Sequence, residues 1–394
     1  MKFLSLSGFI GCALGLALGV GFSGPAHSAN FVIGEHTPLS GKLARVGTGS
    51  HRGVMTGIKV LNDKYAGQHT FELKTIDDES SPAKAVSAVE KLASEGVIAF
   101  SGGYASGVIG PASEAANKAN IPYITFGGVA TALSKRGHEG FFRINSAAGY
   151  GKAIVGLVDE MGLKSISIAY SNKEATHKMA GYIEKKLSEK GLKVSTHEYD
   201  AHVKDFKSIV NKIKLRDRSE AILMVGYESE YVGILRAAKL LKPDVKAMIG
   251  VWSLATGKMA KEFPDLMENV YGTAMLPFPV SFNSPKQKLF YEAFKANFKD
   301  EPSYLEQFGY VQTRLLGEAI VRAFDKNELN LKGIAEELRK TDEETISGRV
   351  RFDEYGDNPE FVQRVGQHQK GTIPLVWPAA SKTGEKVFPG TPWQ

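Results

Sequence analysis

Apolar positions along the chain follow two alternating patterns from residue 31 onward. Short runs rich in β-branched and aromatic residues predict strands at 31–35, 71–77, 97–100, 123–126, 165–170, 194–199, 221–225 and 247–251. Between these runs apolar residues recur every three or four positions, as at Val54, Ile58 and Leu61, which predicts amphipathic helices. Strands that alternate with helices in this way form parallel sheets covered by helices on both faces.

Eight strands over this length fit two α/β lobes better than one, and a single α/β barrel is the alternative. The sequence contains no internal repeat and no low-complexity tract. We therefore expect two doubly wound, Rossmann-like lobes, each with a parallel central sheet.

The first 29 residues have the pattern of an export signal. Lys2 precedes an apolar run over 3–22, and small residues follow over 23–29, so cleavage after Ser28 or Ala29 is predicted. A retained membrane anchor is the alternative. The only cysteine, Cys12, lies inside this segment in a weak lipidation context, so the mature chain has no disulfide and no thiol chemistry. A periplasmic protein is expected.

The composition is that of a soluble globular protein, with 43% hydrophobic residues and a net charge of +6 over 394 residues. Lysines are mixed with acids, as in the stretch 184–190, which indicates a solvated helix face. We therefore expect no nucleic-acid binding, whereas a mildly cationic protein is compatible with an anionic ligand.

A ligand site is predicted between residues 96 and 120. A short strand ends at Gly102 and Gly103, and an alanine-rich helix is expected to begin at Pro111. This layout brings backbone N–H groups and the Ser106 hydroxyl to a helix N-terminus, where an anion is favoured.

Four stretches resemble the branched-chain amino-acid type of periplasmic substrate-binding protein, which serves ABC importers: FVIGEHTPLSGKLARVGTGSHRGVMTGIKVLN, IDDESSPAKAVSAVEKLASEGV, GPASEAANKANIPYITFGG, and DFKSIVNKIK before AILMVGY. The resemblance runs from Phe31 to about Asp357. It implies a type I periplasmic binding fold, in which two lobes joined by three crossings close on a small ligand. By analogy, lobe 1 takes residues 30–146 and 277–345, and lobe 2 takes 147–276 and 346–394.

The resemblance also implies ligand-binding positions. Ser106 falls where relatives hold the ligand carboxylate with a hydroxyl, and Gly127 and Gly128 fall where they present backbone groups to it. Tyr227 matches a tyrosine on the opposing lobe. Each has a plainer alternative, because the glycines could serve only a turn and Tyr227 only helix packing.

Departures from the family pattern indicate a different ligand. Where relatives place an acidic side chain against the ligand ammonium, this chain has Trp252. Val129 and Ala175 also replace a hydroxyl residue and a tyrosine of the relatives. Because an unpaired buried ammonium costs several kcal/mol, such a pocket disfavours α-amino acids.

Aromatic side chains offer a different set of contacts. A flat apolar ligand body could be sandwiched between the rings of Trp252, Tyr104 and Tyr227. The plainer alternative is that Trp252 lies at the rim of the cleft and does not contact the ligand. Glu228 or Glu230 remains an alternative source of the missing charge.

Catalysis, cofactors and metal ions are not expected. The loop 103–107 is not G-x-S-x-G, and no dinucleotide or phosphate-loop fingerprint occurs. The spacing of His197 and His202 favours surface positions over a metal site. Asp77 with Asp78, at a strand end, is expected to cap a helix or fix a loop, and cation binding is the alternative.

These observations predict a monomeric extracytoplasmic solute-binding protein of an ABC importer. It is expected to capture a small organic acid, aromatic or otherwise apolar and without an α-amino group, and to deliver it to a membrane permease. A binder of branched-chain or other neutral amino acids or amides is the first alternative. A periplasmic sensor domain is the alternative from another class.

Overall fold

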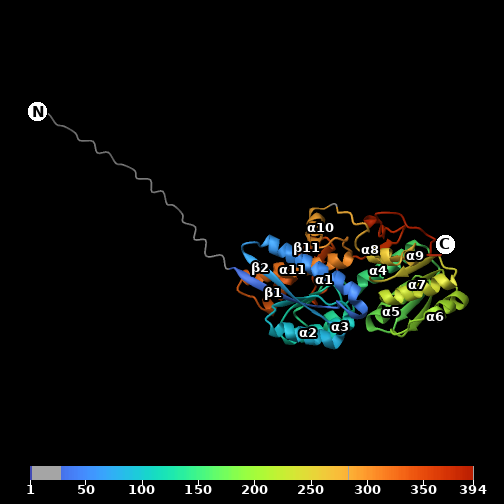
Figure 1. Ribbon diagram of the computed structural model, residues 1–394, viewed down its shortest axis with the longest axis horizontal. Helices are drawn as coiled ribbons and strands as arrows, with labels where there is room; N and C mark the ends of the chain where they lie inside the picture. The colour runs from blue at the N-terminus through green and yellow to red at the C-terminus, as the bar shows by residue number, and fades with distance from the viewer. Residues whose placement is uncertain (2–27, 283, 394) are drawn as a thin grey trace.

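The protein is described by a computed structural model that covers residue 1 and residues 28–282 and 284–393. The predicted export signal over 1–29 lies almost wholly outside these residues, so it stays a prediction. Two lobes lie side by side along the long axis of the molecule (Figure 1). We name them lobe 1, built on a five-stranded sheet, and lobe 2, built on a seven-stranded sheet.

The sheet of lobe 1 is entirely parallel and has the strand order β2-β1-β3-β4-β5. Its strands are β1 (Ala29–Thr37), β2 (His69–Asp77), β3 (Ala99–Ser101), β4 (Tyr123–Thr125) and β5 (Phe141–Arg143). β3, β4 and β5 are buried along their whole length, which explains the apolar or aromatic residues at their first two positions.

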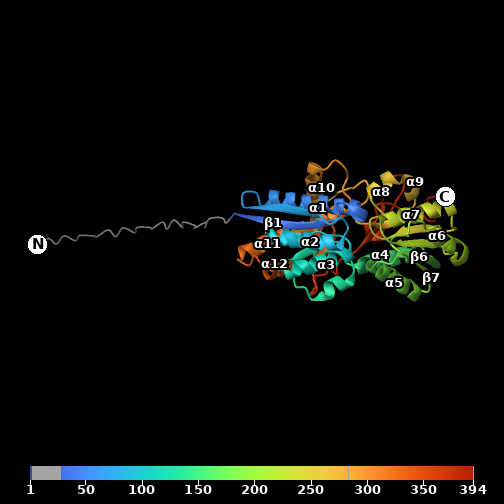
Figure 2. The same cartoon turned by 60° about the horizontal axis from the view of Figure 1, so that its bottom comes forward.

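Helices cover both faces of this sheet (Figures 1 and 2). One face carries α2 (Pro82–Ser94) and α3 (Ser106–Lys118), and the other α1 (Ala44–Lys64), α10 (Pro285–Asn297), α11 (Tyr304–Asp325) and α12 (Leu331–Arg339). Glycines let α1 and α11 pack very closely, because a Cβ on Gly53 would lie 2.2 Å from the Glu306 carbonyl oxygen. This packing fixes the N-terminus of α11, which supplies Tyr304 to the site described below.

The sheet of lobe 2 has the order β14-β13-β10-β9-β8-β6-β7 and is parallel from β10 to β7. Its strands are β6 (Ser165–Ser171), β7 (Lys193–Tyr199), β8 (Ala221–Val225), β9 (Ala247–Gly250), β10 (Tyr271–Ala274), β13 (Arg364–Gln367) and β14 (Leu375–Trp377). Its helices are α4 (Ala147–Glu160), α5 (Glu174–Glu189), α6 (Lys207–Lys212), α7 (Glu228–Leu241), α8 (Gly257–Glu262) and α9 (Pro264–Met267). The predicted fold class, two α/β lobes with parallel central sheets, is confirmed.

The expected helix start at Pro111 is wrong. α3 begins at Ser106, and the amides of Val108 and Ile109 both donate to the Ala105 carbonyl, so the first turn is closed before the proline. Pro111 lies on the exposed side of the helix, where its ring can stand without a clash against the sheet. Ser106 is therefore part of the first helical turn instead of a preceding loop.

The predicted lobe boundaries stay predictions, and one of them falls within a β-hairpin. β11 (Asp342–Thr345) and β12 (Gly348–Arg351) form an antiparallel hairpin that spans the predicted boundary between 345 and 346. After this hairpin, Asp357 bridges to Arg143 at the edge of the lobe 1 sheet.

Each sheet contains a point where the direction of strand addition reverses. In lobe 1 this point lies between β1 and β3, and in lobe 2 between β6 and β8. Loops after two such strands run to opposite faces of the sheet and leave a crevice at the carboxyl edge, where ligands of open α/β sheets bind. The segments that follow β1, β3, β6 and β8 are therefore the first candidates for a site.

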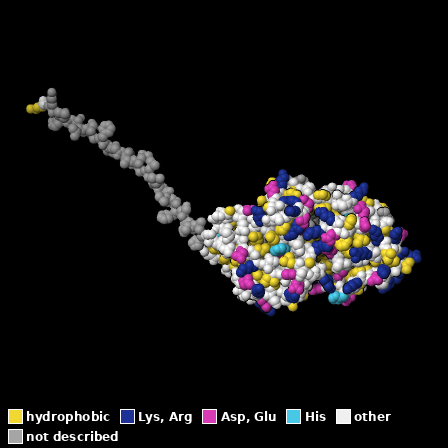
Figure 3. Space-filling view, viewed as in Figure 1, with side chains coloured by type: hydrophobic (Ala, Val, Ile, Leu, Met, Phe, Trp, Pro, Cys, Tyr) yellow, Lys and Arg dark blue, Asp and Glu magenta, His cyan; other side chains and the backbone are white. Residues whose placement is uncertain are grey.

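Charged side chains of both signs are interspersed over the face of the molecule in Figure 3. Over residues 28–282 and 284–393, no helix has the length and apolar character needed to span a bilayer.

Candidate ligand-binding site

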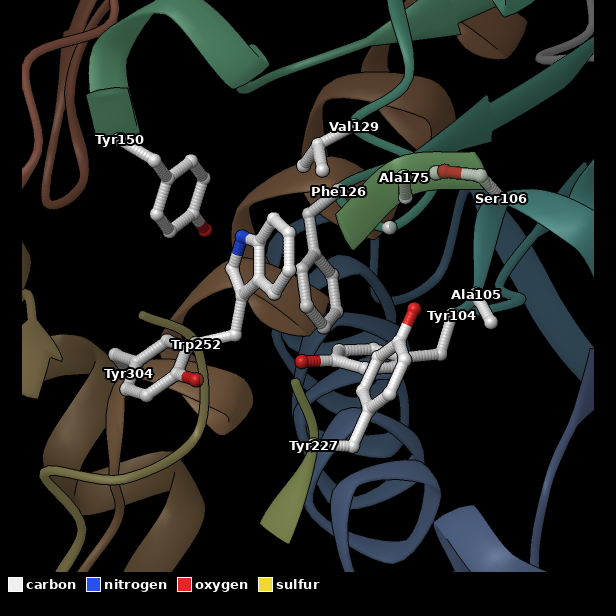
Figure 4. Close-up of a pocket in the computed structure, with 12 residues that line it drawn as sticks. Tyr104, Ala105, Ser106, Phe126, Val129, Tyr150, Ala175, Tyr227, Trp252 and Tyr304 are labelled. Atoms are coloured by element: carbon white, nitrogen blue, oxygen red, sulfur yellow. The ribbon is translucent and has the colours of Figure 1, made fainter. Parts of the chain in front are cut away.

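A pocket lies between the two lobes (Figure 4). Lobe 1 contributes residues after β3 and β4 and the first residue of α11, and lobe 2 contributes residues after β6, β8 and β9 and one residue of α4. The lining residues are Tyr104, Ala105, Ser106, Phe126, Gly127, Gly128, Val129, Tyr150, Ala175, Tyr227, Trp252 and Tyr304. The pocket thus forms where the switch points of the two sheets face each other.

Ser106 offers hydrogen-bond donors at the start of α3. Its Oγ accepts a hydrogen bond from the Ala130 amide over 3.2 Å, which leaves its own hydroxyl proton free to donate. The backbone N–H groups of Ser106 and Gly107 have no acceptor among the described residues. These donors and the positive end of the helix dipole together favour an anion at this position.

The loop after β4 carries one further donor. The amide of Gly127 donates to the Thr125 hydroxyl over 2.8 Å and that of Gly128 to the Tyr104 carbonyl over 2.6 Å, so neither is available to a ligand. The Val129 amide has no partner within the described chain. An anion bound at this loop would therefore meet Val129 N–H instead of the two glycine amides that the resemblance implies.

A buried arginine holds this loop in shape. Arg143 is 1% exposed and donates to the carbonyl oxygens of Gly128 and Ala130 over 2.5 and 3.0 Å. Its other nitrogens form a two-pronged contact with the Asp357 carboxylate at 2.7 and 2.9 Å. By holding these carbonyls, Arg143 fixes the orientation of the peptide groups that face Ser106.

The lobe 2 wall of the pocket is aromatic. The rings of Trp252 and Tyr227 stack with centroids 6.1 Å apart, and Tyr150 meets the indole edge at the same separation. The indole is 4% exposed, and its Nε1–H has no acceptor among the described groups. A buried donor without a partner costs free energy, so a ligand with a suitably placed acceptor would relieve that cost.

Tyr104 and Tyr304 of lobe 1 complete the wall of the pocket. The Ser253 amide of lobe 2 donates to the Tyr304 hydroxyl, which makes a contact across the cleft. Burial raises the pKa of both Tyr104 and Tyr304 above the ordinary tyrosine value, so both hydroxyls stay protonated at neutral pH. They can therefore hydrogen-bond a ligand but carry no charge.

No acidic side chain lines the pocket within the described residues. Glu228, one alternative source of a counter-charge, pairs with Arg45 at 2.5 Å and faces another part of the cleft. Glu230 accepts the Tyr227 amide over 2.7 Å and caps its own helix. Neither carboxylate faces a ligand between Ser106 and Trp252.

The structure brings together all six residues that the sequence singles out, namely Tyr104, Ser106, Gly127, Gly128, Tyr227 and Trp252. That each contacts a ligand stays a prediction. Sequence reasoning did not single out Phe126, Tyr150 or Tyr304. The sequence does offer a signal for Phe126, because it is the last residue of a predicted strand and directly precedes Gly127.

Other sequence candidates lie outside this pocket. Asp77 Oδ1 accepts the amides of Leu39, Ser40 and Glu79, which confirms that it fixes a loop. The expected surface position of His197 is wrong, because its ring is buried and pairs with Asp217 at 2.5 Å. Among the described residues no cluster of three or more His, Cys, Asp and Glu side chains could hold a metal ion.

Comparison with known proteins gives the family. The model of the periplasmic binding protein family matches residues 31–370. The chain belongs to the periplasmic binding protein family. It is an extracytoplasmic solute-binding protein of an ABC transporter and resembles the branched-chain amino-acid type over most of its length.

Its relatives bind different ligands, as their names state. The leucine-, isoleucine-, valine-, threonine- and alanine-binding protein of Pseudomonas aeruginosa is 25% identical over 82% of this chain and 86% of its own length. A branched-chain amino-acid substrate-binding protein from Streptococcus pneumoniae, solved with isoleucine, has a TM-score of 0.77 at 25% identity, over 89% of this chain and all of its own. A solute-binding protein from R. palustris, solved with benzoate, has a TM-score of 0.79 at 18% identity, over 91% of this chain and 98% of its own.

Proposed function

We propose that this protein captures a small organic acid with an aromatic or apolar body and no α-amino group, and delivers it to a membrane permease. One observation carries the proposal. Trp252 occupies the position at which amino-acid-binding relatives are expected to place a carboxylate, and no described acidic side chain lines the pocket.

The charge of the ligand decides how well it fits this site. The unpaired donors of Ser106 and Val129 suit a carboxylate, because hydrogen bonds to a charged group contribute about 1.5 to 3 kcal/mol. The ammonium of an α-amino acid would lose its hydration and find only aromatic rings and tyrosine hydroxyls, at a cost of several kcal/mol. The site therefore favours the acid over the amino acid.

The body of the ligand is expected to be flat. Trp252 and Tyr227 on lobe 2 and Phe126 and Tyr104 on lobe 1 present ring surfaces to the pocket (Figure 4). Aromatic stacking contributes about 1 kcal/mol beyond the burial of apolar area. The R. palustris structure with benzoate supports the view that this fold accommodates an aromatic acid.

A neutral amino acid is the second candidate, because the P. aeruginosa and S. pneumoniae relatives bind such ligands by their names. The ring faces of Trp252 and Tyr227 would then have to hold the ammonium by cation–π contact. An amide without a formal charge would use the same donors less strongly than a carboxylate.

Calorimetry of the purified protein with benzoate, benzamide and leucine separates these candidates. The proposal expects benzoate to bind about 100-fold or more tightly than leucine and about tenfold more tightly than benzamide. Leucine binding that exceeds binding of every carboxylic acid in a panel would overturn it. Benzamide binding equal to benzoate would show that no carboxylate is recognised.

Delivery to a permease from the periplasm belongs to the same proposal. The apolar segment 3–22 and the small residues before Asn30 support export with removal of the signal. Mass determination of the protein recovered from the periplasm tests export with removal of the signal. A recovered chain that retains its first 28 residues would contradict that part of the proposal.

A further inference from the structure

A buried positive charge lies behind the loop that follows β4. We call residues 126–130 the anion loop, because its last amide donates to the Ser106 hydroxyl oxygen at the start of α3. Arg143, the last residue of β5, contacts this loop but does not line the ligand pocket. Arginine stays protonated in proteins, so Arg143 can act on a bound ligand through its charge without touching it.

The peptide group between Gly128 and Val129 links this charge with the pocket. Nη1 of Arg143 donates to the Gly128 carbonyl oxygen over 2.5 Å. The peptide is trans, so its N–H points in the direction opposite to its C=O. The Val129 N–H therefore points away from Arg143, and it has no acceptor among the described residues, while Val129 itself lines the pocket. A ligand carboxylate bound at this amide would have the guanidinium behind its donor.

A cation at the carbonyl oxygen of a peptide group strengthens the N–H of that group as a donor. Hydrogen bonds that share a peptide group polarise one another, and the low dielectric of a protein interior increases the effect. Arg143 is only 1% exposed, so solvent and salt screen its charge weakly. A carboxylate gains more from such a donor than an uncharged oxygen does, because hydrogen bonds to an ionised acceptor are the stronger ones.

The counter-ion of Arg143 lies on the other edge of the guanidinium. Nε and Nη2 donate to the Asp357 carboxylate over 2.7 and 2.9 Å, whereas Nη1 alone contacts the anion loop. Because Nε and Nη2 form the edge opposite Nη1, the positive side of the ion pair faces the loop and its negative side faces away. Ser134 also donates to Asp357, over 2.7 Å. Asp357 therefore weakens the field of Arg143 at the loop but does not cancel it.

The shape of the anion loop does not depend on Arg143 alone. Three of its amides donate to acceptors outside the loop, namely those of Gly127, Gly128 and Ala130 to Thr125, Tyr104 and Ser106. Removal of the guanidinium would leave these three hydrogen bonds in place. The positive charge, in contrast, has no substitute among the residues that line the pocket, because none of them is a lysine or an arginine.

We propose that Arg143 is the positioning residue that makes this site selective for a carboxylate over an uncharged ligand, because it polarises the Gly128–Val129 peptide and places a positive charge behind the Val129 N–H. The inference rests on the proposed function, since it takes a carboxylate at the anion loop as given. Asp357 then sets the strength of the selectivity, because it neutralises part of the charge of Arg143.

The ratio of the benzamide to the benzoate dissociation constant measures this selectivity, because the two ligands share one ring and differ in charge. Calorimetry should give a ratio of about ten for the wild-type protein. Arg143→Met should lower the ratio to about one, since the donor remains but the charge behind it is lost. Arg143→Lys should restore part of the selectivity. If Arg143→Met weakens the binding of both ligands by the same factor, Arg143 only supports the loop and the inference is wrong.

Asp357→Asn tests the charge in the opposite direction. The variant keeps an oxygen beside Nε of Arg143 but removes the negative charge, so the ratio should rise about threefold above the wild-type value. A role of this pair in loop shape alone predicts no such rise, and an unchanged or lower ratio in the folded variant would overturn the inference. Thermal unfolding checks that each variant is folded, and Asp357→Asn decides the question if Arg143→Met does not fold.

Arg136→Met is the matched control. Arg136 also donates to carbonyl oxygens, those of Leu133 and Gly110, and to the Ser113 hydroxyl, but none of these residues lines the pocket. This variant should keep the wild-type ratio, and a fall as large as that of Arg143→Met would contradict a specific role of Arg143. If the wild-type protein binds benzoate no more tightly than benzamide, the proposed function itself is wrong. If the wild-type preference survives Arg143→Met, only this inference is wrong.

Discussion

Arg45 of lobe 1 and Glu228 of lobe 2 form an ion pair across the cleft, with Nε and Oε1 2.5 Å apart. The same guanidinium pairs with Glu262 on α8, so two carboxylates of lobe 2 converge on one arginine of lobe 1. Arg45 lies on α1 and none of the three side chains lines the ligand pocket. This contact exists only when the lobes are together, and it therefore favours the closed arrangement.

Removal of Arg45 should weaken ligand binding without touching the ligand. Because a partly exposed ion pair contributes about 0.2 to 1 kcal/mol, Arg45→Gln should raise the dissociation constant by up to about fivefold. Small-angle X-ray scattering should show a larger radius of gyration for the unliganded variant than for the wild type.

Arg349→Gln is the matched control, because Arg349 pairs with Asp342 inside one hairpin of the same protein. It should leave the affinity and the radius of gyration as in the wild type. Equal effects of the two variants would show that Arg45 has no special role in closure.

The pH dependence of stability should report on Glu228. Burial raises the pKa of Glu228 to about 7, more than the neighbouring Arg45 lowers it, whereas an unfolded glutamate titrates near its ordinary value of 4.5. Between these values the folded protein holds a proton that the unfolded chain releases, so this group destabilises the fold progressively as pH rises toward 7. Denaturant unfolding at pH 5 and pH 8 should therefore show that Glu228→Gln gains stability relative to the wild type at the higher pH. A difference in unfolding free energy between the variant and the wild type that is the same at pH 5 and pH 8 would contradict the raised pKa of Glu228.

Ser106 provides a direct test of the anion site. Ser106→Ala removes the free hydroxyl donor but leaves the helix and its amides in place, so the affinity for benzoate should fall about 10- to 100-fold. Ser94→Ala, an exposed serine at the end of α2, is the control and should bind as the wild type. Unchanged benzoate affinity in a folded Ser106→Ala protein would remove Ser106 from the site.

Local pattern predicts much of this fold and the centre of its site. Ser106 and Tyr227 follow strands with strong apolar runs, so their place at the carboxyl edges of parallel sheets follows from periodicity. Trp252 follows such a strand as well. Their position beside a strand end can be found from one sequence, whereas the choice of Tyr227 and Trp252 as ligand-binding positions rests on the resemblance to relatives.

The residues that escaped prediction depend on distant contacts. Tyr150 lies on α4 after the three-residue strand β5, whose buried Arg143 pairs with Asp357, far along the chain. Tyr304 reaches the pocket because the glycines of α1 and α11 allow those helices to pack closely. His197 is buried by its pair with Asp217 on another segment. Neither the hydrophobic pattern nor the secondary-structure propensities of one sequence indicate which distant residues pair.

The indole of Trp252 should sense the ligand. Because it stacks on Tyr227 and is almost fully buried, an aromatic acid in the pocket should change tryptophan fluorescence of the wild type. Trp252→Ala should weaken benzoate binding by about 1 to 3 kcal/mol through lost burial and stacking. Trp393, which packs against buried apolar residues of lobe 2 that do not line the ligand pocket, offers a control, since Trp393→Phe should retain the fluorescence response. Loss of the response in Trp393→Phe would show that Trp252 does not report on the ligand.

We propose that the pocket accepts an acid and rejects the corresponding α-amino acid. Phenylacetate and phenylglycine differ only by the ammonium group on the α-carbon, so calorimetry with this pair isolates that charge. Wild-type protein should bind phenylacetate about 100-fold or more tightly than phenylglycine, and Trp252→Glu should shift the preference toward phenylglycine by restoring a counter-charge. Phenylglycine binding as tight as phenylacetate binding in the wild type would contradict the account.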